Sequence, residues 1–218
     1  MDTLDNIKDI AFTTGKVLIN QIPIFGELVT EYFTLAKEKI ADKRFTVWMG
    51  MVESKLAKLV RLEEDINKLS SDEFLYSFIQ SATAGAQKTH QNEKREFFAN
   101  ALYNAVAIQD ISEEKKLIFL SFIDRYTLVA IKLLYSYSED QHILENHENL
   151  DSSAQSAPEF AEDRNLVFPL MSQLAADGLI ETQRLVPIDT VDTRRTPITP
   201  FGEEFLRFIT DNSIELND

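Results

Sequence analysis

A helical period of apolar residues runs from residue 7 to residue 137, and it constrains the fold more than any other feature of the chain. Apolar side chains recur there at spacings of three and four, which places them on one face of a helix. The whole chain has only 6 Gly and 6 Pro, so few residues would end a helix. Because 44% of the 218 residues are apolar, the chain can bury a core. The sequence therefore predicts a mainly α fold, with a multi-helix body of five or six helices over residues 1–137.

The beginning of this pattern, residues 7–36, is apolar on more than one face and is broken or kinked at Pro23. The stretch from Ile10 to Gly26 contains one charged residue, yet it is too short and too polar for a conventional membrane span. Two interpretations stay open: a helical hairpin buried under the rest of the protein, or a surface that inserts into a membrane or docks on a partner. The apolar side chains on which both interpretations depend are Phe12, Leu18 and Phe25.

A seven-residue repeat marks the next predicted helix, residues 31–69. An apolar residue at every seventh position is typical of a coiled-coil contact. The contact is made either with another helix of this chain or with the same helix of a second copy, which would give a homodimer. The repeating residues are Phe45, Val52, Leu59 and Ile66.

Residues 72–109 predict two helices, or one helix with a break near residues 85–91, and a serine at residues 70–71 is the expected cap. Asn100 and Asn104 lie one turn apart between apolar rows, so we expect a buried polar contact across a helix interface. No acid, base or nucleophile accompanies the two amides, and an active site is therefore not expected there.

The last helix of the body is predicted from Ser112 to Tyr137, and because it is apolar nearly all round we expect it to be the central buried helix. Residues 138–161 are acidic and rich in serine, and they predict a linker or loop. Residues 138–218 contain 17 acidic residues and five arginines, which gives this part of the chain a charge of −12 out of the total net charge of −14. This acidic half repels phosphate, which argues against nucleic-acid binding and favours a basic protein partner.

The C-terminal region, residues 162–218, predicts a helix, a hairpin and a second helix. Gly178 is expected to end the first helix, because glycine enters the left-handed region without steric cost. Residues 179–188 alternate loosely, residues 189–193 have the composition of a turn, and residues 194–199 are predicted as a return strand at an edge. Thr199 is the expected cap of the last helix, with Pro200 at its first position. This order predicts a small winged-helix-like subdomain with one β-hairpin.

Three stretches resemble known families. Residues 178–180, GLI, and residues 198–209, ITPFGEEFLRFI, are similar to the ends of winged-helix repressors and of the bacterial abortive-infection alpha family. Residues 93–105, EKREFFANALYNA, resemble a pattern in uncharacterised bacterial helical proteins. The first resemblance implies a winged-helix subdomain and a role in phage defence, whereas the second implies no particular chemistry.

Motifs for catalysis or cofactor binding are not found in the sequence. The segment most similar to a phosphate-binding loop is TTGK at residues 13–16. The full motif needs Gly at position 10 and Ser or Thr at position 17, and this chain has Ile10 and Val17 there. His142 and His147 are five residues apart, a spacing that does not align two metal ligands on a helix. The chain has no Cys. We therefore expect no enzyme, no metal and no cofactor.

Three function classes follow. The favoured one is a non-catalytic bacterial interaction protein with a protein partner, serving as an accessory or effector of phage defence. The second is a winged-helix DNA-binding regulator, which the acidic charge disfavours, and the third is a membrane-acting helical effector. The acidic N-terminus and the lack of cysteine favour a cytoplasmic location, to which the third class would add membrane association. Candidate partner-binding residues on the predicted wing are Arg184, Arg194 and Arg195.

Overall fold

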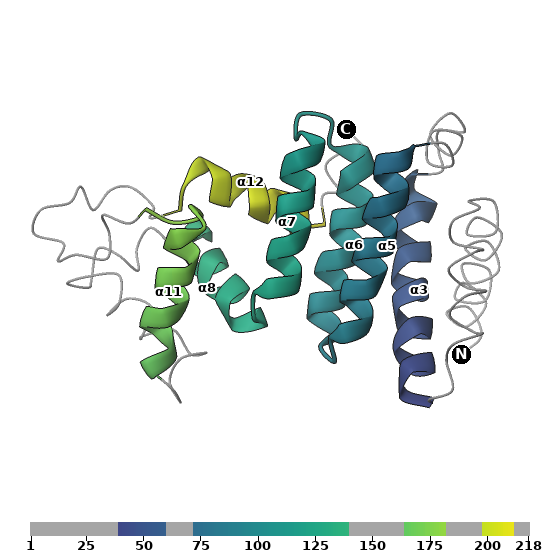
Figure 1. Ribbon diagram of the computed structural model, residues 1–218, viewed down its shortest axis with the longest axis horizontal. Helices are drawn as coiled ribbons and strands as arrows, with labels where there is room; N and C mark the ends of the chain where they lie inside the picture. Colours follow the sequence, from purple (N-terminus) through teal and green to yellow (C-terminus); the bar gives the residue numbers. More distant parts are fainter. Residues whose placement is uncertain (1–38, 60–71, 140–163, 182–197, 212–218) are drawn as a thin grey trace, which may run out of the picture. The chain divides into compact units, whose positions relative to one another are not determined.

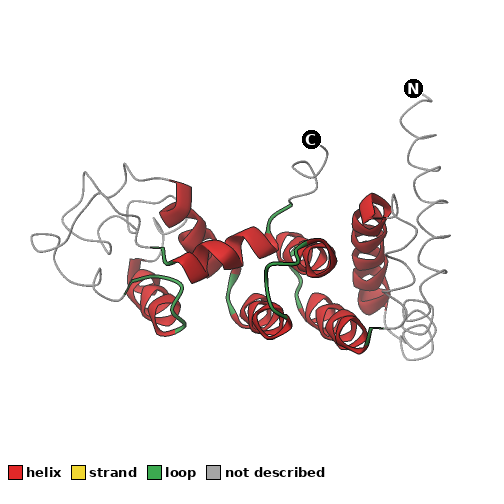
Figure 2. Cartoon of the chain, turned by 90° about the horizontal axis from the view of Figure 1, so that it is seen from above, coloured by secondary structure: helices red, strands yellow, loops and turns green. Residues whose placement is uncertain are grey.

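The computed structural model describes residues 39–59, 72–139, 164–181 and 198–211 (Figure 1). These residues form seven α-helices and one short 3-10 helix, and Figure 2 draws all of them as helices and connecting loops. The predicted mainly α class is confirmed. A β-hairpin is not present among the described residues, so the winged-helix part of the fold prediction stays a prediction.

The chain divides into two compact units. The first takes its described residues from Met1–Asp124 and Phe208–Asp218, and the second takes them from Arg125–Arg207. The sequence predicted one body up to residue 137 and a separate subdomain from residue 162 onward. The two compact units differ from this predicted division in two places. Helix α8 (Leu128–Glu139), which follows Arg125, belongs to the second unit, and the chain from Phe208 onward belongs to the first.

The described residues before Phe208 in the first unit form four helices: α3 (Lys39–Leu59), α5 (Glu73–Lys88), α6 (Asn92–Ala107) and α7 (Glu113–Arg125), of which the last residue belongs to the second unit. Helix α6 packs against α3 and α5, and every residue from Phe98 to Ala105 is buried, so this part of α6 is enclosed on all sides. Alanines at three of these eight positions let neighbouring helices approach closely. The central helix of the unit is therefore α6, and the prediction that residues 112–137 hold this place was wrong.

Helix α5 begins one residue after its cap, Asp72. The carboxylate Oδ1 of Asp72 accepts hydrogen bonds from the main-chain N–H groups of Phe74, at 2.9 Å, and Leu75, at 3.2 Å. A carboxylate also complements the positive end of the helix dipole. The cap is thus Asp72 rather than a serine at residues 70–71, and those serines lie outside the described residues.

Two separate helices occupy residues 72–109, which decides between the two alternatives left open by the sequence. The chain leaves the helical conformation at residues 89–91, between α5 and α6. At Gly85 the two helices meet so closely that a Cβ atom would lie 2.4 Å from the ring of Phe98. Any larger side chain at Gly85 would therefore push α5 away from α6.

The segment predicted as one helix from residue 112 to residue 137 is two helices in the structure. Helix α7 ends at Arg125, and α8 (Leu128–Glu139) follows after two residues. The hydroxyl of Thr127 accepts a hydrogen bond from the N–H of Ala130 at 3.2 Å, which is a helix cap and explains the new start. Leu117, expected on a buried face, is 44% exposed.

Helix α3 directs the described part of its seven-residue repeat into the core. Phe45, Trp48 and Val52 are buried, and α3 packs against α5 and α6. The indole Nε1 of Trp48 donates a hydrogen bond to the hydroxyl of Thr83 at 3.2 Å. These residues therefore make their contact within the chain, and a homodimer through residues 31–69 stays a prediction.

The second unit contains α8, the 3-10 helix η2 (Arg164–Leu166), α11 (Val167–Ala176) and the greater part of α12 (Pro200–Ile209). Helix α11 continues directly from η2 and packs against α8. Gly178, the second residue after α11, has a φ of 75°, which confirms it as the residue that ends this helix. Ile180 and Ile198 form an isolated antiparallel bridge. The rest of the predicted hairpin, residues 182–197, lies outside the described residues.

Helix α12 starts at Pro200, as predicted, and Thr199 caps it. The hydroxyl of Thr199 accepts a hydrogen bond from the N–H of Gly202 at 3.0 Å, and the N–H of Thr199 donates to the carbonyl of Leu179 at 3.0 Å. A Cβ atom at Gly202 would lie 2.3 Å from the same carbonyl oxygen. Glycine is therefore required where the first turn of α12 passes the bridge.

Candidate functional site

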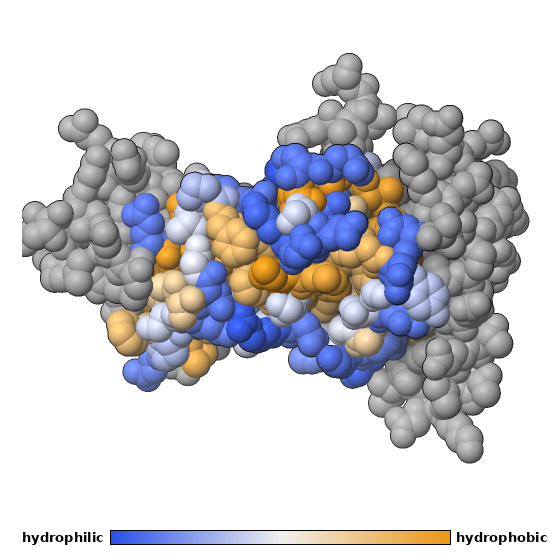
Figure 3. All heavy atoms as spheres, turned by 45° about the horizontal axis from the view of Figure 1, so that its top comes forward, coloured by the Kyte–Doolittle hydropathy of each residue, from blue (hydrophilic) through white to orange (hydrophobic). Residues whose placement is uncertain are grey.

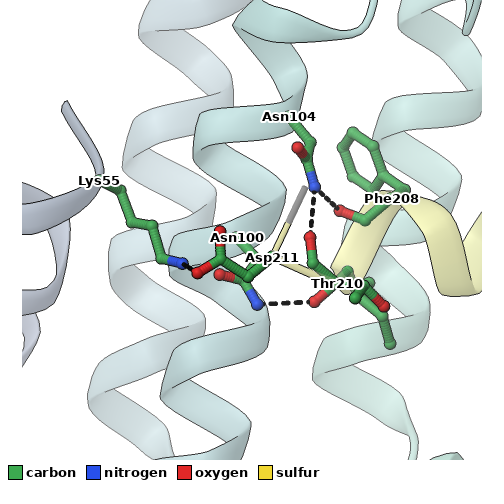
Figure 4. A network of polar contacts seen from close by, with 7 residues as sticks. Lys55, Asn100, Asn104, Phe208, Thr210 and Asp211 are labelled. Atoms are coloured by element: carbon green, nitrogen blue, oxygen red, sulfur yellow. Dashed lines mark hydrogen bonds and ion pairs between the residues drawn. The ribbon is translucent and has the colours of Figure 1, made fainter. Parts of the chain in front are cut away.

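The polar centre of the first unit is the pair Asn100 and Asn104 on α6. The Nδ2 atom of Asn100 donates to the carbonyl oxygen of Ile209 at 2.9 Å. The Nδ2 atom of Asn104 donates to the carbonyl oxygens of Phe208, at 2.8 Å, and Thr210, at 2.9 Å (Figure 4). Asn100 is 7% exposed and Asn104 is 0% exposed, so the bonds to Ile209 and Phe208 form away from water, whereas the bond to Thr210 is partly buried. The two amides therefore hold three successive carbonyl groups of a segment far away in the sequence.

These carbonyls need donors because they lie at the end of a helix. The last four carbonyl groups of an α-helix have no partner inside it, and α12 ends at Ile209. The side-chain amides of α6 supply the missing donors for Phe208 and Ile209 and extend the same pairing to Thr210, one residue beyond the helix. We call Phe208–Asp211 the C-terminal segment.

An ion pair completes the polar contacts of this segment. The Nζ atom of Lys55, on α3, lies 2.7 Å from Oδ2 of Asp211. The Lys55 side chain is 11% exposed and that of Asp211 is 40% exposed, so the cation is the more buried partner. Burial, and secondly the charge of Asp211, raise the pKa of the neighbouring Tyr103 phenol. Lys55, Asn100 and Asn104 together form what we call the α6 site.

The apolar side chains of the C-terminal segment enter the core beside the α6 site. Phe208 and Ile209 are both fully buried. The Phe208 ring centroid lies 5.6 Å from that of Phe119 and 6.2 Å from that of Phe78, the latter with an edge-to-face arrangement. The site therefore takes two buried apolar side chains, three carbonyl oxygens and one carboxylate.

Two other buried cations of the first unit have a structural use. Arg95 donates to the carbonyls of Ala86 and Thr89 near the end of α5, and Lys116 donates to the carbonyl of Ala105 near the end of α6. Burial lowers the pKa of both side chains. The nearby charge of Arg44 lowers the pKa of Arg95 further, whereas neighbouring carboxylates act in the opposite direction on the pKa of Lys116. These cations cap helix ends, as cations near a helix C-terminus commonly do.

The second unit has its own polar cluster at the end of α11. Both Arg125, at 2.7 Å, and the buried hydroxyl of Tyr126 contact Oδ2 of Asp177, the residue that follows α11. The guanidinium of Arg125 also lies 5.4 Å from the centroid of the Tyr126 ring. Burial, followed by the hydrogen bond to Asp177, raises the pKa of Tyr126. In this cluster side chains contact one another, whereas in the α6 site the asparagine side chains donate hydrogen bonds to main-chain carbonyl groups.

The described surface carries scattered apolar residues. Figure 3 shows hydrophobic residues exposed between hydrophilic ones on one face. Such residues are ordinary on protein surfaces when they stand singly. The large apolar residues that are exposed are Tyr76, Leu117, Ile118, Leu166 and Phe168.

Of the residues predicted from the sequence as site residues, the described part of the chain contains Asn100 and Asn104. Phe12, Leu18 and Phe25 lie outside the described residues, as do Arg184, Arg194 and Arg195. Within the described ranges, no cluster of side chains could hold a metal ion, and no helix is both long and apolar enough to cross a membrane.

Sequence reasoning missed Lys55 and the C-terminal segment as parts of the site. A signal for Lys55 existed, because it follows Trp48 by seven residues and Val52 by three, and so lies on the buried face of α3. The pairing of α6 with Phe208–Asp211 has no local signal. Comparison of the chain with protein-family models, with curated proteins and with solved structures gives no match.

Proposed function

We propose that this chain is a non-catalytic bacterial interaction protein that recognises a protein partner. The observation that supports this most strongly is the α6 site, where two buried amides donate to consecutive main-chain carbonyls of a segment more than 100 residues away. The primary amides bind main-chain carbonyl groups, and the ammonium group of Lys55 binds a carboxylate. Groups of these kinds are suited to recognising a peptide segment.

The resemblance of residues 178–180 and 198–209 to the abortive-infection alpha family supports a role in phage defence. Three features favour a winged-helix-like arrangement of residues 162–218: the left-handed Gly178, the bridge between Ile180 and Ile198, and the capped start of α12. In this proposal the arginines of the predicted wing contact the protein partner rather than DNA, because the surrounding half of the chain is acidic.

The proposed interaction is tested by purifying the tagged full chain from cells that carry its gene and quantifying co-purified proteins by mass spectrometry. We expect one protein to co-purify in a constant ratio with the chain. Recovery of the chain alone, at every salt concentration tried, would contradict the proposal.

The defence role is tested by phage challenge of cells expressing the full chain. The charge reversals Arg194→Glu and Arg195→Glu are expected to abolish protection if the wing contacts the partner. Lys43→Glu, an exposed change on α3, is the matched control and should protect like the wild type. A gel shift with random duplex DNA at low salt distinguishes the regulator alternative, for which binding would be required.

A further inference from the structure

The side-chain oxygen of Asn100 is a buried acceptor of the α6 site. Asn100 is 7% exposed, and its Oδ1 atom has no hydrogen-bond partner, although its Nδ2 atom donates to Ile209. A primary amide can both donate and accept. Buried polar atoms are nearly always paired, so an unpaired amide oxygen in the middle of α6 needs an explanation.

The conformation of the present occupant explains the unused acceptor. At the end of a helix the carbonyl groups are free, whereas the N–H groups are directed back into the helix and are already bonded. The end of α12 can therefore satisfy the donor of Asn100 but not its acceptor. In an extended chain, one residue presents its N–H and its C=O toward the same side, as paired residues of a β-ladder do. An extended segment would engage both atoms of the Asn100 amide.

The other contacts define which side chains such a segment must carry. Phe208 and Ile209 are fully buried, so an incoming segment has to replace two apolar side chains. Lys55 is nearly buried and faces Asp211, so a carboxylate two residues after the apolar pair would keep the ammonium group paired.

We propose that the α6 site binds an extended segment of a partner protein, in which two apolar residues are followed, after one further residue, by an acidic one. The C-terminal segment Phe208–Asp211 occupies the site as an intramolecular ligand and is exchanged for the partner segment. This inference rests on the proposed function, because it names the kind of partner that the interaction protein takes. The intramolecular ligand competes at an effective concentration on the order of millimolar, so the partner binds tightly only where the exchange gains new contacts.

The experiment uses the purified full chain and a fluorescent synthetic peptide that copies residues 205–216, with binding followed by anisotropy. Asp211→Lys in the protein places two cations opposite each other and weakens the binding of the C-terminal segment to the site, and we expect the peptide to bind this variant about fivefold more tightly than the wild type. Asp211→Asn is the milder second variant, should Asp211→Lys not fold. Adding Asn100→Leu to either variant is expected to reduce peptide affinity about tenfold, because both main-chain bonds are lost.

Exchanging the two charges of the Lys55–Asp211 pair tests whether the peptide occupies the α6 site itself. The protein variant Lys55→Glu should bind the peptide carrying Asp211→Lys about fivefold more tightly than the original peptide, whereas Lys43→Glu should show no such preference. Circular dichroism checks that each variant is folded. Equal binding by wild-type and released protein, or no effect of Asn100→Leu, would overturn the proposal.

Sedimentation of the wild-type chain decides between a partner segment and a second copy. A monomer supports the proposal, whereas a dimer that the peptide dissociates would overturn it, because the occupant would then be the C-terminal segment of another copy. All components are purified, so failure of the peptide to bind would leave the co-purification of a partner unaffected. A positive peptide result without a co-purified partner would instead count against the proposed function.

Discussion

The α6 site of the first unit and the Asp177 cluster of the second unit both join chain segments that are distant in sequence, but they do so by different means. In the first, the amides of Asn100 and Asn104 donate to main-chain carbonyl groups. In the second, Arg125 and Tyr126 converge on one carboxylate, that of Asp177. Main-chain carbonyls are common to all residues, whereas a carboxylate belongs to one side chain.

This difference bears on what each region can exchange. A site that recognises main chain can accept another segment with suitable flanking side chains, and the Oδ1 atom of Asn100 has no hydrogen-bond partner in the present arrangement. The Asp177 cluster depends on three particular side chains, so replacing Asp177 would remove the hydrogen bond that the buried Tyr126 donates to it. We therefore expect the first region to be the exchangeable one and the second to be a fixed structural contact.

The largest effect is expected from Asn104→Leu in the first region. The substitution removes the amide that serves the carbonyls of Phe208 and Thr210, and it should lower the free energy of unfolding by about 3 kcal/mol. Urea denaturation measures the change, and hydrogen exchange should show it first in the helices of the first unit. Ser77→Ala, an exposed change on α5, is the control and should have almost no effect. A cost as small as that of the control would mean that the main-chain contact is not stabilising.

The matching substitution in the second region is Tyr126→Phe, which removes the hydroxyl bonded to Asp177 and should cost about 2 kcal/mol near neutral pH. Burial is the main reason that the folded state raises the pKa of Tyr126, so the neutral phenol is favoured by folding. This stabilisation is complete below the ordinary pKa of 10.0 and decreases as the pH rises above it. The difference between wild type and Tyr126→Phe should therefore narrow above pH 10.0. If the difference in unfolding free energy between wild type and Tyr126→Phe grew above pH 10.0, the pKa of Tyr126 would be lowered by folding and not raised.

A smaller effect is expected at the start of α12, in the second unit. Thr199→Ala removes the hydroxyl that accepts from Gly202 and should cost about 1 kcal/mol. Thr199→Ser keeps the hydroxyl and serves as the control, with most of the stability retained. Thermal unfolding followed by circular dichroism measures both variants, and equal loss in the two would show that the methyl group, rather than the cap, matters.

The smallest effect concerns the ion pair of the α6 site. Because Asp211 is 40% exposed, a double-mutant cycle of Lys55→Met and Asp211→Asn should give a coupling energy of about 0.5 kcal/mol, decreasing with added salt. A coupling energy that does not change with salt would show that the pair is shielded from solvent. The ion pair would then hold the C-terminal segment more firmly than an exchangeable ligand requires.

Local rules predicted several features of this protein correctly. The apolar period indicated helices, Gly178 marked the end of α11, and Thr199 with Pro200 marked the start of α12. Asn100 and Asn104 were recognised as a polar pair between apolar rows, and the structure places both inside α6 with main-chain partners. These features depend on residues within one or two helical turns of each other, which is the range over which sequence patterns act.

Other features were decided by tertiary structure alone. Periodicity continued through residues 126–127, because the buried Tyr126 fits an apolar pattern, and only the cap at Thr127 revealed two helices. The partner of Asn100 lies 109 residues away, at Ile209, and no spacing rule connects the two. The sequence by itself determined where helices form and which residues are suited to burial. Which segments meet in the core was determined by packing, since a buried amide is stabilised by any carbonyl group that the fold brings within hydrogen-bonding distance.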